Sequence, residues 1–307
     1  MDAQPPVAAP ALTVVGVDAG ATKAIAEAVT VGGERLGRAE GPGANPKRHG
    51  LDVAANRILA LVHGTMPGEQ APALVYVAGA GIDRPVHARA LEAALAVGLP
   101  GTRIVVANDT MAALRAGTPD GVGLVIPVST GGNVIGRAPD GRVTDRGHGI
   151  FGGGYVLGAL AARAVAFHRH GVGRALAAAV REAADPGWRG RRPAPEAALL
   201  ALSVVAAARA GDPWPARIVD RWCSRVTAAC VEETARLDLG PAPVAIVYGG
   251  LADASPWLRA RIGAAVLAGV PGARITGLAA EPVAGAVALA LDALAGRQAG
   301  WDFTPRR

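Results

Sequence analysis

A short turn near the start of the chain has residues that could bind an anion. It follows the β-branched run Thr13–Val17 and reads Asp18-Ala19-Gly20-Ala21-Thr22-Lys23. Small residues in a hairpin turn let backbone N–H groups approach phosphate oxygens without a Cβ in the way. Thr22 adds a hydroxyl donor, Lys23 a positive charge, and Asp18 could hold a magnesium-bound water. The turn predicts a phosphate site, with a plain hairpin turn as the alternative.

A second turn of the same kind occurs about 110 residues later. The apolar run Val122–Val128 is followed by Ser129-Thr130-Gly131-Gly132 and then by a strand-like run, Asn133–Arg137. Both turns lie in a strand–turn–strand–turn–strand pattern, which indicates two similarly built lobes rather than a short-period repeat. Two such hairpins facing each other across a cleft could hold a polyphosphate from both sides, and the repetition disfavours two plain turns.

Two further strand ends have residues suited to chemistry. Asn108-Asp109 follows the run Arg103–Ala107, and the carboxyl ends of parallel strands point into a ligand crevice. A carboxylate there could accept the proton of a hydroxyl that attacks a γ-phosphate. The alternative role for Asp109 is a helix N-cap. The pair Gly249-Gly250 follows the run Ala242–Tyr248, where it either allows close approach of a flat ligand such as adenine or simply forms a turn.

The elements that would position these turns alternate between strands and helices. Apolar spacing predicts helices over 52–63, 85–97, 110–116, 155–170, 194–210 and 215–237. This alternation indicates an α/β fold with a largely parallel sheet and right-handed crossovers. We expect a disordered lead-in (1–12), an N-terminal lobe (13–118), a C-terminal lobe (119–281), a closing helix that returns to the first lobe (282–296) and a tail (297–307).

Composition excludes several classes of protein. The 307 residues are 51% hydrophobic and 18% charged, which argues against disorder. No apolar run reaches the ~18–20 residues of a membrane span, and the arginines are scattered rather than arranged as a nucleic-acid-binding stripe. Cys223 and Cys230 lie in a helical stretch and are expected to be buried free thiols in a reduced, cytoplasmic setting.

Taken in order, these motifs resemble those of a known family. The segments are GVDAGATK, GPGANP, VAGAG, VANDTMAAL, VSTGGNVIGR, VYGGLADASPWL and EPVAGAVALAL. Their order is similar to that of the N-acetylglucosamine kinase and BadF/BadG/BcrA/BcrD ATPase family, within the actin/hexokinase/Hsp70 superfamily. The resemblance spans residues 13 to about 294. It implies a two-lobed actin/hexokinase-like (ribonuclease H-like) α/β fold with a nucleotide cleft between the lobes, and ATP and Mg²⁺ as cofactors.

The resemblance also implies roles for individual residues. Asp109 would be the catalytic base and Asp18 the residue linked to the metal. The positions matching ATP-binding residues are Gly20, Ala21, Thr22, Lys23, Thr130, Gly131, Gly132, Gly249 and Gly250, and those matching substrate-binding residues are Asn45, Gly79, Asn108, Asp109 and His148. The chain departs from the family's G-W-G-x-x-x-G-D-E-G-S-G segment, because the stretch 147–154 lacks the Asp-Glu pair that helps bind substrate hydroxyls in similar kinases.

The leading hypothesis is an ATP-dependent kinase in which Asp109 deprotonates a hydroxyl of an amino sugar or N-acetyl amino sugar, of N-acetylglucosamine or glucosamine type. The first alternative is an ATPase that activates a partner enzyme, as BadF-type activators do with an iron–sulfur cluster held by cysteines. The second is a sugar or nucleotide sensor without turnover. The expected partners are a small sugar and a second copy of the chain in a homodimer, with neither nucleic acid nor a membrane.

Overall fold

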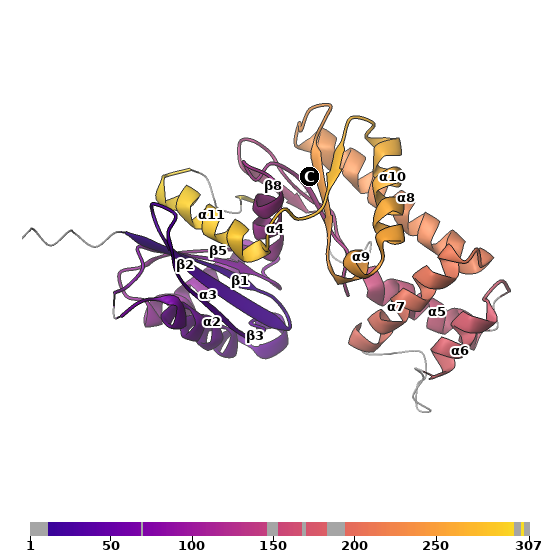
Figure 1. Ribbon diagram of the computed structural model, residues 1–307, viewed down its shortest axis with the longest axis horizontal. Helices are drawn as coiled ribbons and strands as arrows, with labels where there is room; N and C mark the ends of the chain where they lie inside the picture. Colours follow the sequence, from indigo (N-terminus) through magenta and orange to yellow (C-terminus); the bar gives the residue numbers. More distant parts are fainter. Residues whose placement is uncertain are drawn as a thin grey trace, which may run out of the picture. The chain divides into compact units, whose positions relative to one another are not determined.

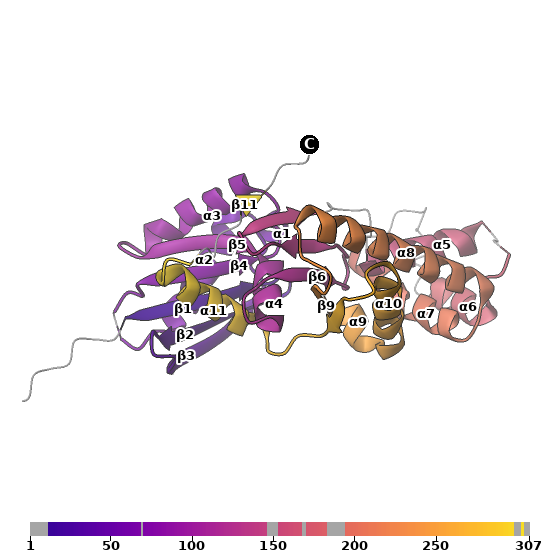
Figure 2. The same ribbon diagram turned by 90° about the horizontal axis from the view of Figure 1, so that it is seen from above.

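The computed structural model describes residues 12–68, 70–145, 153–167, 170–182, 194–297 and 302–303 (Figures 1 and 2). Contacts between residues divide them into two units. Unit 1 contains residues 12–116 and 280–297, and unit 2 contains the described part of Gly117–Ala279. Each unit has a sheet and a buried apolar cluster of its own. No helix within the described ranges is long and apolar enough to cross a membrane.

Unit 1 is built on a mixed sheet with the strand order β3-β2-β1-β4-β5. The strands are β1 (Thr13–Ala19), β2 (Lys23–Thr30), β3 (Arg35–Pro42), β4 (Leu74–Gly79) and β5 (Arg103–Asn108). β1 pairs antiparallel with β2 and parallel with β4, which pairs parallel with β5. Ala19, Gly79 and Asn108 are in register, so the carboxyl ends of three parallel strands meet at one end of this sheet.

Helices cover both faces of the unit 1 sheet. They are α1 (Pro46–His49), α2 (Leu51–Thr65), α3 (Pro85–Gly98), α4 (Asp109–Gly117) and α11 (Pro282–Leu294). In Figure 1, α2 and α3 lie on one side of the sheet and α11, in yellow, lies on the other. The apolar stripes of α2 and α3, which include Ile58 and Leu91, pack on the β-branched strands. On the opposite side α11 packs on β1, and Arg115 of α4 forms a 3.0 Å ion pair with Asp292 of α11.

Unit 2 has a second mixed sheet in which the strands run in the order β10-β9-β6-β7-β8. The strands are β6 (Gly123–Pro127), β7 (Ile135–Arg137), β8 (Arg142–Asp145), β9 (Val244–Tyr248) and β10 (Arg274–Thr276), and the two-residue strand β11 (Asp302–Phe303) is the last described element. β6 pairs antiparallel with β7 and parallel with β9. Pro127 is in register with Tyr248, so the carboxyl ends of β6 and β9 lie side by side.

Helices form a large part of unit 2. They are α5 (Gly153–Ala166), α6 (Arg174–Glu182), α7 (Ala194–Arg209), α8 (Pro213–Arg236), α9 (Gly250–Ala254) and α10 (Pro256–Gly269). α7 packs against both α5 and α8, and α8 also packs against α10 (Figure 2). Cys223 and Cys230 of α8 are free and buried in this core, as the sequence predicts. Burial raises the pKa of Cys223 to about 11 and that of Cys230 to about 12, so both thiols are inert.

Candidate functional site

The turn between β1 and β2 in unit 1 is held by its neighbouring backbone. The carbonyl oxygens of Gly20 and Thr22 accept hydrogen bonds of 3.0 Å from the N–H groups of Ala44 and Gly43, which follow β3. A Cβ at Gly43 would overlap the carbonyl of Ala21, so this close approach requires a glycine. Thr22 and the neighbouring Lys23 are exposed. The backbone of the turn is therefore fixed while its hydroxyl and ammonium groups remain accessible.

The ammonium group of Lys23 has a carboxylate partner. It lies 2.8 Å from Glu40 of β3 in an ion pair whose two side chains are about half exposed. Only two of the 31 basic residues of the chain are lysines, and the other, Lys47, forms an ion pair with Asp83. Both lysines therefore lie in unit 1, in or near the predicted site. This scarcity of lysine is a sequence signal that the motif analysis overlooked, since a lysine ammonium is a compact point charge that arginine does not reproduce.

Asp18 ends β1 beside two further carboxylates. Its pKa is raised to about 7, chiefly by burial and then by the negative charges of Asp109 and Glu281, against the opposing effect of Lys23. Among the described residues, no group of three or more His, Cys, Asp or Glu side chains could hold a metal ion. Mg²⁺ typically takes one or two carboxylates and completes its shell with water and phosphate. Asp18 therefore fits a nucleotide-bound Mg²⁺, whose charge would offset the repulsion among the carboxylates.

The structure separates the two roles considered for the Asn108-Asp109 pair. Asn108 is buried, and its Oδ1 accepts a 3.0 Å hydrogen bond from the N–H of Thr110 while its Nδ2 donates to the carbonyl of Ile82. This is the bond of a helix N-cap, and Asn108 makes it at the start of α4. Asp109 is the first residue of α4, partly buried, and close enough to raise the pKa of Asp18. The cap at Thr110 thus does not depend on the carboxylate of Asp109.

The substrate candidates of unit 1 lie around the carboxyl ends of its strands. Asn45 caps α1 by accepting a 2.9 Å hydrogen bond from the N–H of Lys47, and its side chain lies against Gly81, in the loop after β4. Gly79 ends β4, in register with Asn108. Because Asn108 is buried with its polar groups bonded, Asn45 is the more accessible of the two amides. The remaining candidate, His148, lies outside the described residues.

The second turn, in unit 2, is joined to the Gly249-Gly250 pair. The N–H of Val128 donates to the carbonyl of Tyr248 at 2.7 Å, and the N–H of Leu251 donates to the carbonyl of Val128 at 3.0 Å. These bonds follow from the parallel pairing of β6 and β9, which ends at Pro127 and Tyr248. The structure therefore brings together two motifs that are about 120 residues apart in the sequence.

The first residues of α5 hold the same turn from another side. The carbonyls of Ser129 and Thr130 accept hydrogen bonds of 2.8 and 2.9 Å from the N–H groups of Gly154 and Tyr155. Gly153 has a φ of +44°, and a Cβ there would overlap the carbonyl of Gly131, so only glycine fits this position. Ser129, Thr130 and Gly131 are exposed. The turn is uncharged, and backbone contacts alone are described as holding it.

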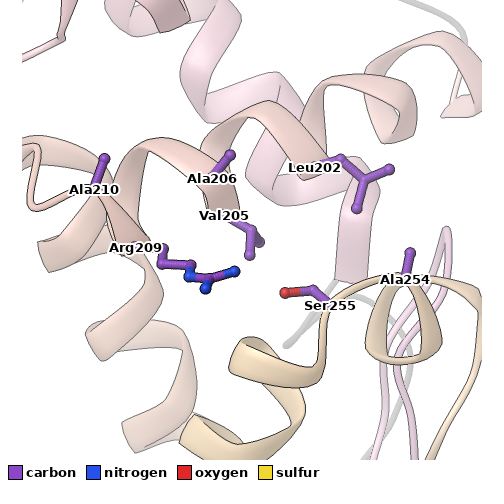
Figure 3. Close-up of a pocket in the computed structure, with 7 residues that line it drawn as sticks. All are labelled: Leu202, Val205, Ala206, Arg209, Ala210, Ala254 and Ser255. Atoms are coloured by element: carbon purple, nitrogen blue, oxygen red, sulfur yellow. The ribbon is translucent and has the colours of Figure 1, made fainter.

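A cavity of about 560 Å³ lies in unit 2, next to the helix that follows the glycine pair (Figure 3). It is lined by Leu202, Val205, Ala206, Arg209 and Ala210 of α7 and its end, and by Ala254 and Ser255 at the end of α9. Figure 3 shows the side chains of Arg209 and Ser255 pointing toward each other across it. The sequence analysis did not include α7, although the spacing 202, 205, 206 and 209 places these residues on one helix face.

Comparison with known families identifies the group to which these motifs belong. The model of the BadF/BadG/BcrA/BcrD ATPase family matches residues 15–290. The chain belongs to this family. Membership in the BadF/BadG/BcrA/BcrD ATPase family confirms the resemblance that the motif order indicated. Among curated protein sequences, none matches the chain.

Solved structures confirm the expected fold. A candidate N-acetylglucosamine kinase from Chromobacterium violaceum aligns with a TM-score of 0.66 and 20% identity, covering 92% of this chain and 99% of the other. A candidate N-acetylglucosamine kinase from Porphyromonas gingivalis gives 0.61 and 22%, covering 90% and 97%. A ROK family glucokinase from Streptomyces griseus, solved with glucose and AMPPNP, gives 0.53 and 20%, covering 91% and 99%. This BadF/BadG/BcrA/BcrD family member thus has the α/β fold of actin/hexokinase-type sugar kinases.

Proposed function

We propose that this protein is an ATP-dependent kinase that phosphorylates a hydroxyl group of an amino sugar or N-acetyl amino sugar. The observation that supports this most is the continuity of three features within unit 2. The exposed turn at Ser129–Gly131, the pair Gly249-Gly250 and the cavity beside α9 follow one another along the ends of β6 and β9. Family membership and the kinase fold supply the remaining support.

The cavity has the size and lining expected for the adenosine part of ATP. Its volume, about 560 Å³, lies within the ~300–1,000 Å³ of small-molecule sites. Leu202 and Val205 provide apolar contact, and the planar guanidinium of Arg209 could stack on a purine. The hydroxyl of Thr130 and the N–H groups of Gly131 and Gly132 would then donate hydrogen bonds to phosphate oxygens.

Unit 1 would supply the acceptor site and the general base. Thr22 and Lys23 would bind phosphate, Asn45 and Gly79 would contact the sugar, and Asp109 would accept the proton of the attacking hydroxyl. Asp18 would hold Mg²⁺, which neutralises phosphate charge when bound. Phosphoryl transfer depends mainly on positioning and electrostatics, so Asp109 is one contribution among several. The choice of an amino sugar rests on the family resemblance and on the names of the structural neighbours.

The two alternative functions receive less support. An activator with an iron–sulfur cluster would need accessible cysteine ligands, whereas Cys223 is 3% exposed and Cys230 is fully buried in the core of unit 2. A sensor without turnover would not require a carboxylate at position 109, where the chain has an aspartate at the start of α4 and Asn108 makes the cap. We therefore retain the kinase as the proposal.

A panel of amino sugars, plain hexoses and cyclitols, with ADP release as the readout, tests this proposal. With the best substrate, Asp109→Asn should lower kcat by roughly 10²–10⁴-fold, the usual contribution of a general base. ATP affinity should barely change, and α4 should stay folded because Asn108 makes its cap. Asp52→Asn, at an exposed aspartate of α2, is the matched control. Near-normal turnover by Asp109→Asn would refute the assignment, and ADP release with no sugar would favour the ATPase alternative.

A further inference from the structure

The charged side chains beside the first turn share one face of the unit 1 sheet. Gly16 pairs with Glu27 and Asp18 pairs with Ile25 across β1 and β2, so these positions point to the same side. A Cβ at Gly16 would overlap the backbone of Val287, which identifies this side as the one that α11 covers. Alternation adds Lys23, two residues before Ile25. The two candidate groups for metal and phosphate, Asp18 and Lys23, therefore lie on the α11 face.

The edge strand β3 adds its charges to the same face. Arg38 pairs with Glu27 and Glu40 pairs with Ile25 in the β2–β3 register. The Arg38 guanidinium lies 3.4 Å from Glu27, 3.2 Å from Glu40 and 2.9 Å from Glu281, the residue that precedes α11. Glu40 in turn holds Lys23 at 2.8 Å, and Arg35 lies 4.0 Å from Glu27. We call this set of charges the Arg38 cluster; its members are Lys23, Glu27, Arg35, Arg38, Glu40 and Glu281.

The Arg38 cluster is balanced, with three cations and three carboxylates. We infer that Arg38 and Glu40 are positioning residues that set how readily Lys23 binds phosphate. Glu40 competes with phosphate for the ammonium of Lys23, and Arg38 remains as the cationic partner of Glu40 once Lys23 has moved. This inference rests on the proposed function, since it takes a nucleotide phosphate as the anion that Lys23 binds.

Each ion pair in this exchange is partly exposed, which sets the size of the effect. Lys23 and Glu40 are 54% and 48% exposed, and Arg38 is 27% exposed. Hydrogen bonds from Lys23, and then from Arg38, hold the pKa of Glu40 below its usual range, so Glu40 is a charged competitor at neutral pH. Exposed pairs of this kind are weak. We therefore expect changes of about two- to fivefold in phosphate binding rather than all-or-none effects.

The two partners of Glu40 predict variants with opposite effects. Glu40→Gln removes the competitor, so AMPPNP with Mg²⁺ should bind about two- to fivefold more tightly. Arg38→Gln leaves Lys23 as the remaining cation on Glu40, so the same ligand should bind more weakly by a similar factor. Arg38→Lys should restore binding toward that of the wild type. Glu34→Gln, at an exposed carboxylate in the turn between β2 and β3, is the matched control.

The scarcity of lysine gives a second readout that does not need the proposed function. Lys23 and Lys47 are the only lysines in the chain, so an amine-reactive reagent followed by peptide mass spectrometry reports on each separately. Without nucleotide, Lys23 should react faster in Glu40→Gln and more slowly in Arg38→Gln than in the wild type. Lys47, paired with Asp83, should react equally in all variants and serves as the internal reference.

Opposite shifts of the two variants in both measurements would support the inference. A merely structural cluster would lower the stability of both variants and shift AMPPNP binding in the same direction, which would overturn it. Unchanged Lys23 reactivity in Glu40→Gln would also overturn it, whatever the ligand does. Wild-type protein that binds no AMPPNP, with the expected changes in Lys23 reactivity, would refute the proposed function and the phosphate step while leaving Glu40 as the residue that restrains Lys23.

Discussion

The turn after β1 and the turn after β6 occupy the same position in similar hairpins but are held by different means. The first is next to ionisable groups, with Asp18 before it, Lys23 after it and Glu40 bound to that lysine. The second, at Ser129–Gly132, has no charged residue of its own. Backbone hydrogen bonds from the start of α5 and the close approach of Gly153 support it. One sequence pattern therefore produces a phosphate-binding candidate tuned by charge and another shaped by the absence of side chains.

This difference determines which perturbation should damage which turn. A change in pH, salt or side-chain charge should act through unit 1, because its turn depends on groups that titrate or form ion pairs. A methyl group added to the backbone should act through unit 2, because its turn depends on carbonyl and N–H groups in close contact. Variants of the two turns can therefore be compared in pairs.

Gly153→Ala should give the largest loss of stability. The substitution places a Cβ against the carbonyl of Gly131 and forces a positive φ on alanine, which together should lower the free energy of unfolding by about 2–5 kcal/mol. Gly131→Ala is the matched control, because a Cβ there meets no atom within 4 Å. Urea unfolding of both variants measures the difference. Equal stability of the two would mean that the contact between α5 and the turn does not hold it.

Asp18→Asn should change the pH dependence of stability. Since folding raises the pKa of Asp18 from 3.8 to about 7, the folded state binds more protons between these values and the unfolding free energy falls as pH rises through the window. The contribution is on the order of 2–4 kcal/mol, reduced by the partial exposure of the side chain. The variant should lose this slope and be the more stable protein at pH 8.

Unfolding at several pH values, with and without Mg²⁺, measures this effect. Mg²⁺ should recover part of the lost stability at pH 8 in the wild type and not in Asp18→Asn. Asp52→Asn, at an exposed position in α2, is the control for removing one carboxylate. Parallel curves for the wild type and Asp18→Asn would show that Asp18 is not the buried acid of the first turn.

Removing the two threonine hydroxyls should give the smallest effects. Thr130→Val should weaken AMPPNP binding by the roughly 1–3 kcal/mol of a lost hydrogen bond to a charged group. Thr22→Val should cost less, because Lys23 continues to attract phosphate in the first turn. Isothermal titration of both variants gives the comparison. A larger loss in Thr22→Val than in Thr130→Val would reverse the assignment of the charged and uncharged turns.

Much of the fold followed from short-range patterns. Apolar runs bounded by turn residues predicted both hairpins, and helical spacing predicted the α7 and α8 segments. The helix α6 was missed, since its buried side chains Leu176 and Val180 are too few to give a clear apolar stripe and Gly171 and Gly173 precede it. Such a helix is stabilised by packing on α5 and α7, which local sequence does not reveal.

The site was less predictable than the fold for a related reason. Motifs located Asp18, Lys23 and Asp109, but the partner of each depends on strand register or on a distant segment. Glu40 reaches Lys23 only through the β2–β3 register, and Glu281 affects Asp18 from the start of α11. The capping role was considered for Asp109, and the structure gives the bond at Thr110 to Asn108. Sequence reasoning therefore identified reactive groups better than the groups that restrain them.

The late position of α11 in the chain has a consequence for biosynthesis. α11 packs on β1, yet it follows the whole of unit 2 in the sequence. At ordinary translation rates, roughly 10–30 s separate the synthesis of residue 116 from that of α11. During that interval one face of the first sheet waits for its cover, while the residues of unit 2 emerge as a continuous segment. Unit 2 can thus complete its core on the ribosome before the earlier-made sheet is closed, and the exposed face of β1 is where a chaperone would be needed.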